Sequence, residues 1–158
     1  MAEIAGRLLR ICLEGAPLHL ISALQQADRD QAVQDLQSDN AFTPVGFAGL
    51  QSVLHLGVQN GRLVFDIRDA QDAPVVAVGL ALGPFKMLIK DYQMLLDSYA
   101  GAVAEGREAK IQAIDMGRRG LHNEGAELML QRLAGKVEID FATARRLFTL
   151  VCALHQKL

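Results

Sequence analysis

Several residue types that mark particular classes of protein are scarce in this chain of 158 residues. The two cysteines, Cys12 and Cys152, are too few for a disulfide framework, so we expect both thiols to be free in a reducing compartment. There is no tryptophan, and six phenylalanines and two tyrosines offer few rings for stacking on bases. The formal net charge of −2 provides no excess of positive charge. We therefore expect no nucleic-acid partner.

Long apolar runs are missing as well. No segment approaches the roughly 18 apolar residues of a transmembrane helix, and Glu3, Arg7 and Arg10 interrupt the N-terminal segment where a signal peptide would need an apolar region. We therefore expect no membrane association and a cytoplasmic location. Hydrophobic residues nevertheless make up 51% of the chain, which excludes disorder. The length suits one core, so residues 1–158 are expected to form a single domain.

The clearest local pattern is Asn60-Gly61 between two alternating segments, which predicts a β-hairpin with a type I′ turn. A two-residue loop sets the register of the two strands. That register places three apolar pairs on the core face: Val58–Leu63, Leu56–Phe65 and Leu54–Ile67. A third alternating segment at 75–82 extends the hairpin into an antiparallel meander. Residues 7–14 predict a further strand, with Leu9, Ile11 and Leu13 on one face, and 136–139 a short one.

The same register places His55 directly opposite Asp66 on the other face of the sheet. A carboxylate beside an imidazole favours its charged form. We therefore expect a raised pKa for His55, with Asp66 as the cause.

Helical patterns occupy much of the remaining chain. Residues 17–27 are compatible with a helix, and apolar residues recur at helical spacing in five further segments: 30–37, 84–103, 107–117, 123–134 and 141–155. Gly117 and Gly120 are expected to end the helix before them, Asn123 to begin the next, and Asp140 to cap the last, whose inward residues include Phe141.

Together these patterns predict an α+β fold, in which an antiparallel sheet of three to four strands packs against four to five helices, mainly on one face. The second face of the sheet is mixed in character and includes apolar or small residues such as Leu8, Cys12, Val64 and Ala77. Such a face needs a second helix layer or a partner chain. We therefore expect a symmetric homodimer.

The densest polar cluster contains Arg118, Arg119, His122, Asn123 and Glu124. Guanidinium groups bind phosphate and carboxylate as planar forks, and a helix that begins near Asn123 would direct backbone N–H groups toward an anion. The cluster therefore predicts an anion-binding site at a junction between two helices. The structural alternative is that Arg118 and Arg119 complement the end of the preceding helix and pair with nearby carboxylates.

Arg145 and Arg146 lie about one turn into the last helix. If that helix packs near the junction, these arginines extend the candidate site. Adjacent positions on a helix point about 100° apart. We therefore expect one arginine of each pair to face the anion and the other to bind a carboxylate.

The sequence offers little for catalysis or metal binding. His122 and Glu124 have the H-x-E spacing of zinc deaminases, but the P-C-x-x-C segment of those enzymes is missing. Cys152 and His155 could share a helix face, but a buried thiol and a hydrogen-bonded histidine are far commoner than a metal-binding pair. No G-x-S-x-G or P-loop motif is present. We expect no metal, no cofactor and no assignable catalytic residue.

Four segments resemble Uncharacterised Protein Family 0262, a bacterial family: GRLVFDIRD, PFKMLIKDY, IDMGRRGLHNEGAELMLQRL and IDFATARRLFTLVCALH. The likeness runs from about residue 50 to the C-terminus. The resemblance implies a small bacterial cytosolic protein. It implies no activity, cofactor or catalytic residue.

These observations favour a non-enzymatic binding or regulatory protein. It would act through the arginine-rich junction, through a homodimer surface, or through both, with a small anionic ligand or another protein as partner. The alternative is a small enzyme that acts on a phosphate or carboxylate substrate, with His122 and Glu124 as acid–base groups.

Overall fold

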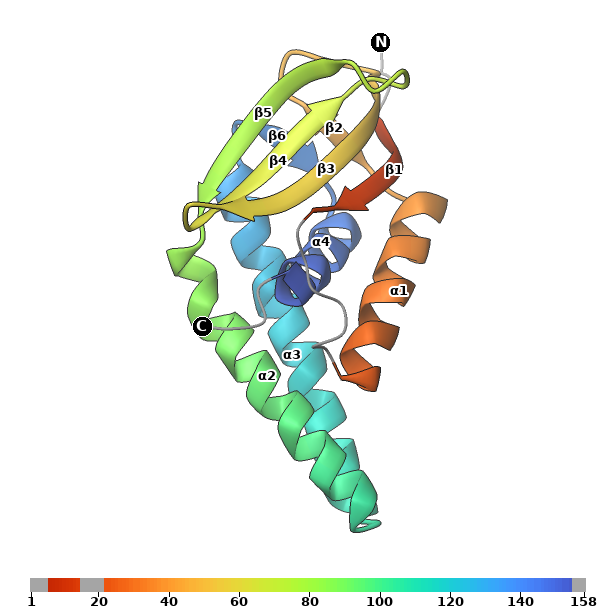
Figure 1. Ribbon diagram of the computed structural model, residues 1–158, viewed down its shortest axis with the longest axis vertical. Coiled ribbons are helices and arrows are strands. Elements are labelled where there is room, and N and C mark those ends of the chain that lie inside the picture. Colours follow the sequence, from red (N-terminus) through yellow and green to blue (C-terminus); the bar gives the residue numbers. More distant parts are fainter. Residues whose placement is uncertain (1–5, 15–21, 155–158) are drawn as a thin grey trace.

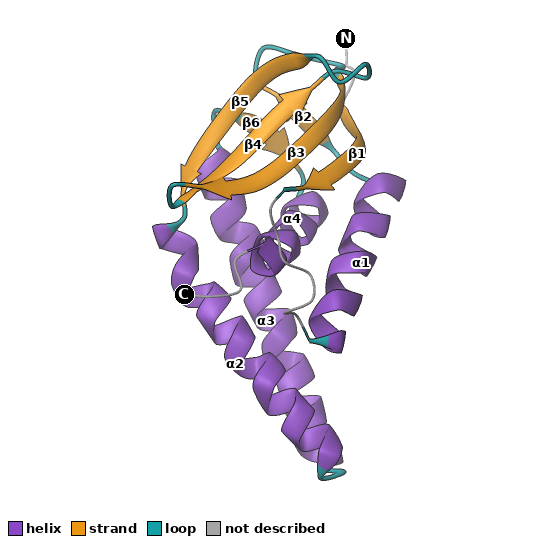
Figure 2. Ribbon diagram, in the orientation of Figure 1, coloured by secondary structure: helices purple, strands orange, loops and turns teal. Residues whose placement is uncertain are grey.

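The computed structural model describes residues 6–14 and 22–154. Within those ranges the chain forms a four-stranded sheet, a two-stranded sheet and four helices. The strands are β1 (Arg7–Leu13), β2 (Phe42–Pro44), β3 (Gln51–Gln59), β4 (Arg62–Arg68), β5 (Pro74–Ala81) and β6 (Val137–Ile139). The helices are α1 (Ala23–Ser38), α2 (Gly83–Ala104), α3 (Glu108–Leu133) and α4 (Phe141–Leu154). The helices lie on one side of the large sheet (Figures 1 and 2), which confirms the α+β prediction.

The hairpin of β3 and β4 has the predicted turn and register. Asn60 and Gly61 have φ angles of 53° and 72°, as a type I′ turn requires. Leu56 lies opposite Phe65, and the other two predicted pairs also form. Five of these six side chains are fully buried, and Val58 is half-buried. The turn therefore sets which face of the sheet meets the helices.

The large sheet has the order β1-β3-β4-β5 and is antiparallel except for one pair. β1 runs parallel to β3 because the connection between them passes through α1. The pairing shifts between Leu8 and Arg10, so Leu8 and Ile11 both reach the core. Simple alternation is therefore wrong for this strand, and Leu9 is 41% exposed.

The two-stranded sheet joins β2 and β6 in antiparallel orientation. β6 is the short strand predicted near the C-terminus, whereas β2 had no clear sequence signal. Phe42, at the start of β2, is fully buried, so this small sheet contributes to the same core.

α1 is a single helix over sixteen residues rather than a short helix at 30–37. The Ser22 side chain accepts a hydrogen bond from the Gln25 N–H at 3.1 Å and caps its start. Beyond its end, the Asn40 side chain bonds both backbone groups of Leu8 and so attaches this end of the helix to β1. The first residues of the helix-compatible stretch 17–27 lie outside the described residues.

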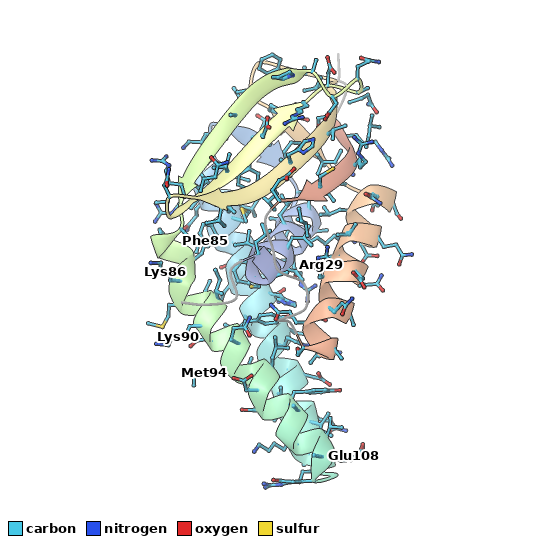
Figure 3. All side chains as sticks on the ribbon, viewed as in Figure 1. Arg29, Phe85, Lys86, Lys90, Met94 and Glu108 are labelled. Atoms are coloured by element: carbon cyan, nitrogen blue, oxygen red, sulfur yellow. The ribbon has the colours of Figure 1, made fainter. Side chains whose placement is uncertain are left out.

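α2 follows the predicted pattern, with Phe85 and Tyr92 fully buried. Figure 3 shows Phe85 pointing inward beneath the sheet. The chain leaves this helix at Gly106, whose φ of 66° suits glycine. No helix among the described residues is both long and apolar enough to cross a membrane.

α3 is continuous over twenty-six residues, so the predicted break between Gly117 and Asn123 is wrong. The glycines are helical and do not form a turn. Gly125 has a packing role, because a Cβ atom there would collide with the Phe148 ring of α4. Nothing in the structure explains Gly120, around which the space is open.

α4 lies between α1 and α3 beneath the sheet (Figure 1). Asp140 caps it as predicted, accepting a hydrogen bond from the Thr143 N–H at 2.8 Å. Leu147, Phe148 and most other predicted inward side chains are buried. Phe141 is 43% exposed, so its predicted inward orientation is wrong.

The outer face of the sheet carries a charged network. His55 lies opposite Asp66 as predicted, but its Nδ1 lies 2.8 Å from Glu14 Oε1 and its Nε2 lies 2.9 Å from Asp72 Oδ1. Asp66 is bound instead by Arg68 at 2.8 Å. The hydrogen bond to Glu14 raises the pKa of His55, against an opposing effect of burial and with further help from Asp72. The predicted direction is therefore confirmed, and the predicted partner is wrong.

The contrast between two glycines of α3 gives a prediction about packing. Gly125→Ala should lower the free energy of unfolding by about 1–3 kcal/mol, because the new methyl group overpacks the buried Phe148 ring. Gly120→Ala should raise it by about 0.5–1 kcal/mol, because alanine is the better helix former and meets no neighbour. Urea denaturation measures both, and equal effects would contradict the packing of α3 on α4.

The network around His55 predicts a pH dependence. Because the folded pKa lies above the ordinary value of 6.5, the stabilisation is complete below pH 6.5 and is lost as pH rises through the folded pKa. Glu14→Gln should move the pKa of His55 down toward the ordinary value, and Asp66→Asn should move it less. An NMR titration of the His55 ring measures both shifts. A larger shift from Asp66→Asn would show that the assigned partners are wrong.

Candidate functional site

A cavity of about 250 Å³ lies between α1, α3 and α4. It is lined by Asp28, Gln31, Ala32, Asp35, Arg118, Arg119, His122, Arg145, Arg146 and Thr149. Five of the seven candidate residues therefore meet there, although no helix junction brings them together. The continuous α3 places Arg118 and His122 on one face, since residues four apart lie one above the other. α4 contributes the two remaining arginines.

Arg118 is held by carboxylates of its own chain. Its Nη1 lies 2.7 and 2.9 Å from the two oxygens of Asp28, and its Nη2 lies 3.2 Å from Asp115 Oδ1. Burial opposes the charge of Arg118, but Asp28 outweighs it and the pKa of Arg118 is raised. The structural alternative thus holds for this arginine.

Asp28 has a second strong donor in Tyr92 of α2, whose hydroxyl lies 2.5 Å from Asp28 Oδ2. Burial, and then the negative charge of Asp28, raise the pKa of Tyr92, so its hydroxyl stays protonated and donates. One carboxylate therefore connects three helices. Both oxygens of the Asp28 carboxylate therefore already accept hydrogen bonds from side chains of the same chain.

The other three arginines make no ion pair with a carboxylate in the part of the chain that the structure describes. Arg145 Nε donates to Asn123 Oδ1 at 3.3 Å, and Arg146 Nη1 donates to the Asp39 carbonyl oxygen at 2.8 Å. Arg119 is exposed at the rim. Burial and then the charge of Arg118 lower the pKa of Arg145, with Asp28 offsetting part of the effect. Of each predicted pair, one arginine was expected to bind a carboxylate: Arg118 of α3 does so, and neither arginine of α4 does among the described residues.

His122 is 6% exposed, and its ring packs against the rings of Tyr92 and Phe148 at centroid distances of 5.3 and 6.3 Å. Its Nε2 atom is buried and has no hydrogen-bond partner in the described part of the chain. Burial, followed by the charge of Arg145, lowers the pKa of His122 to about 4. The ring is therefore neutral at neutral pH and presents an unpaired nitrogen.

Asn123 and Glu124 do not line the cavity. Asn123 touches the site only through its bond to Arg145, and Glu124 is exposed on another face of α3. Residues two apart on a helix do not face each other. His122 and Glu124 therefore do not form the acid–base pair of the enzyme hypothesis.

The sequence pattern did not predict the acidic wall of the cavity, which is formed by two aspartates of α1. Asp28 and Asp35 are seven residues apart, which places them on one face of α1. That spacing would have been a usable signal had α1 been predicted as one helix. Asp35 accepts a hydrogen bond from Gln31 at 2.9 Å, so it is less constrained than Asp28.

No group of three His, Cys, Asp or Glu side chains within 6–14 and 22–154 is arranged to hold a metal ion. Cys152 is completely buried, and burial raises the pKa of its thiol, which opposes a reactive thiolate. His155, its possible partner in the sequence, lies outside the described residues.

The fold and the cavity define an α+β protein in which three helices line an arginine-rich pocket beneath a sheet. Residues 5–157 match Uncharacterised protein family (UPF0262). The chain therefore belongs to UPF0262, a bacterial family, as the four motifs indicate.

Relatives cover nearly the whole chain. A UPF0262 protein of Acidiphilium cryptum is 61% identical over 156 residues, 99% of this chain and 96% of the relative. One from Granulibacter bethesdensis is 60% identical over 161 residues, 96% and 91% of the two chains. One from Maricaulis maris is 43% identical over 157 residues, which cover 99% of this chain and 98% of the relative. No solved structure matches the chain.

Proposed function

We propose that this protein is a non-enzymatic binding module whose cavity takes a small ligand that carries a phosphate or carboxylate group. The observation that carries the proposal is the setting of Arg145. This guanidinium is partly buried, lies beside Arg118, Arg119 and Arg146, and forms no ion pair with a carboxylate among the described residues. An anion would supply the missing charge.

The unpaired Nε2 of His122 supports the same function. A buried polar atom without a partner is costly, and a ligand can provide the hydrogen bond. A neutral imidazole can donate or accept at this atom, so it suits either a bare or a protonated ligand oxygen. Four arginines against two carboxylates give the lining an excess of positive charge.

Binding without chemistry is the favoured role because His122 lacks Glu124 as a partner in the cavity. A regulatory use would follow if the ligand changed how α1 packs on α3 and α4.

Two cysteines without a disulfide support the cytoplasm as the location.

Thermal unfolding in the presence of inorganic phosphate tests the proposal. Phosphate should raise the melting temperature more than sodium chloride at equal ionic strength does, because a specific ligand stabilises by mass action. Arg145→Gln should weaken phosphate binding by about tenfold or more, equivalent to about 1.4 kcal/mol. Its stability without phosphate should be unchanged or higher, since the substitution relieves crowding among like charges.

Arg132→Gln is the matched control, because Arg132 is exposed in the last turn of α3 and does not line the cavity. It should respond to phosphate as the unmodified protein does. Equal responses to phosphate and chloride in all three proteins would overturn the proposal. So would a destabilised Arg145→Gln protein that still binds phosphate normally, since that result makes Arg145 structural.

A further inference from the structure

β5 is a free edge of the large sheet, and no described strand lies beyond it (Figure 1). Its register with β4 is regular along most of its length, and just past its end the Leu82 N–H donates to the Gly61 carbonyl oxygen at 3.3 Å. In an antiparallel pair, alternate residues direct their backbone groups toward the neighbour and the residues between them away from it. Within the regular part of β5, three residues therefore direct N–H and C=O groups outward: Ala77, Gly79 and Ala81.

Arg62 supports this assignment. Its Nη2 donates to the Gly79 carbonyl oxygen at 3.3 Å. It reaches that oxygen by lying across Gly79, where a Cβ atom would be 3.2 Å from the guanidinium group. A carbonyl oxygen has two lone pairs, so Gly79 can still accept a bond from another strand. The other outward backbone groups of β5 have no partner among the described residues.

The two edges of this sheet differ in their protection. β1 carries Arg7 and Arg10 and has an irregular register at Leu9, and these features hinder the addition of another strand. β5 has the sequence PVVAVGLA, with no charged residue and with proline only at its first position. Apart from the Arg62 guanidinium at Gly79, no charge lies along this edge, and an edge with so little protection is a template for pairing.

We propose that two copies of this chain pair through β5 in antiparallel orientation about a two-fold axis, which joins their sheets into one of eight strands. A two-fold axis places the same strand opposite itself, so each outward donor meets an acceptor of the other copy. Ala77 and Ala81 have small side chains, which leave room for a neighbouring strand. This inference is independent of the anion site.

A second copy also explains exposed apolar residues on the adjoining helix. Met87 and Met94 of α2 are 68% and 61% exposed, and their spacing of seven places them on one face of the helix. Figure 3 shows Met94 on the outward side of α2, the side on which β5 also lies. Two paired strands alone bury less than the roughly 1,000 Å² expected of a stable interface. The methionines of both copies would add the apolar area.

The test is light scattering with the full chain over about 1–200 µM. The unmodified protein should be a dimer in the upper part of that range. Ala77→Pro removes one outward N–H that is not needed for pairing with β4, a position where an edge strand tolerates proline. It should weaken the dimer at least about tenfold, or about 1.4 kcal/mol, with an unchanged circular dichroism spectrum.

Val64→Lys is the matched control, because Val64 and Ala77 both line the outer face of the sheet but only Ala77 lies on the edge. It should leave the dimer intact, whereas a dimer built on the outer face would dissociate. Hydrogen exchange provides a measurement without mutation: the Ala77 and Gly79 amides should become protected as concentration rises. A monomer at every concentration, or a dimer that responds to Val64→Lys and not to Ala77→Pro, would overturn the proposal.

Discussion

The carboxylate of Asp28 connects three helices, and the cavity depends on it. Arg118 of α3 and Tyr92 of α2 both donate to this one group of α1. The two side chains of the ion pair are only 22% and 18% exposed, so water screens their attraction less than that of a surface pair. This contact joins α1 to α3 at the wall of the cavity, which both side chains line.

The cavity beside this ion pair has an excess of positive charge, because four arginines and two aspartates line it. Asp28 is paired with Arg118, so Arg119, Arg145 and Arg146 have no comparable carboxylate partner within residues 6–14 and 22–154. The neutral ring of His122 lies in the same cavity. A protein that needed these arginines only for stability would be expected to pair them internally, because an uncompensated charge that is partly buried is unfavourable. An anionic ligand would remove this unfavourable free energy by neutralising the charge of the arginines.

Much of the fold was predictable because local rules governed it. The Asn60-Gly61 turn set the register of β3 and β4, and Asp140 set the start of α4. α3 was mispredicted because a glycine in a helix costs only about 1 kcal/mol, which tertiary packing such as that of Gly125 on Phe148 can offset. Arg118 and Arg119 were found because they belong to the densest polar cluster of the sequence, whereas Asp28 was missed because its partner is ninety residues away. The partners of His55 also depended on a distant loop and on competition from Arg68.

The coupling between Asp28 and Arg118 can be measured by a double-mutant cycle in urea denaturation, with Asp28→Asn, Arg118→Gln and the combined variant. Because the ion pair between α1 and α3 is partly shielded from water, we expect a coupling free energy of about 1–3 kcal/mol. The double variant should then be more stable than the sum of the two single effects implies. A coupling below about 0.3 kcal/mol, as an exposed and independent pair would give, would contradict the role of this contact in holding the cavity together.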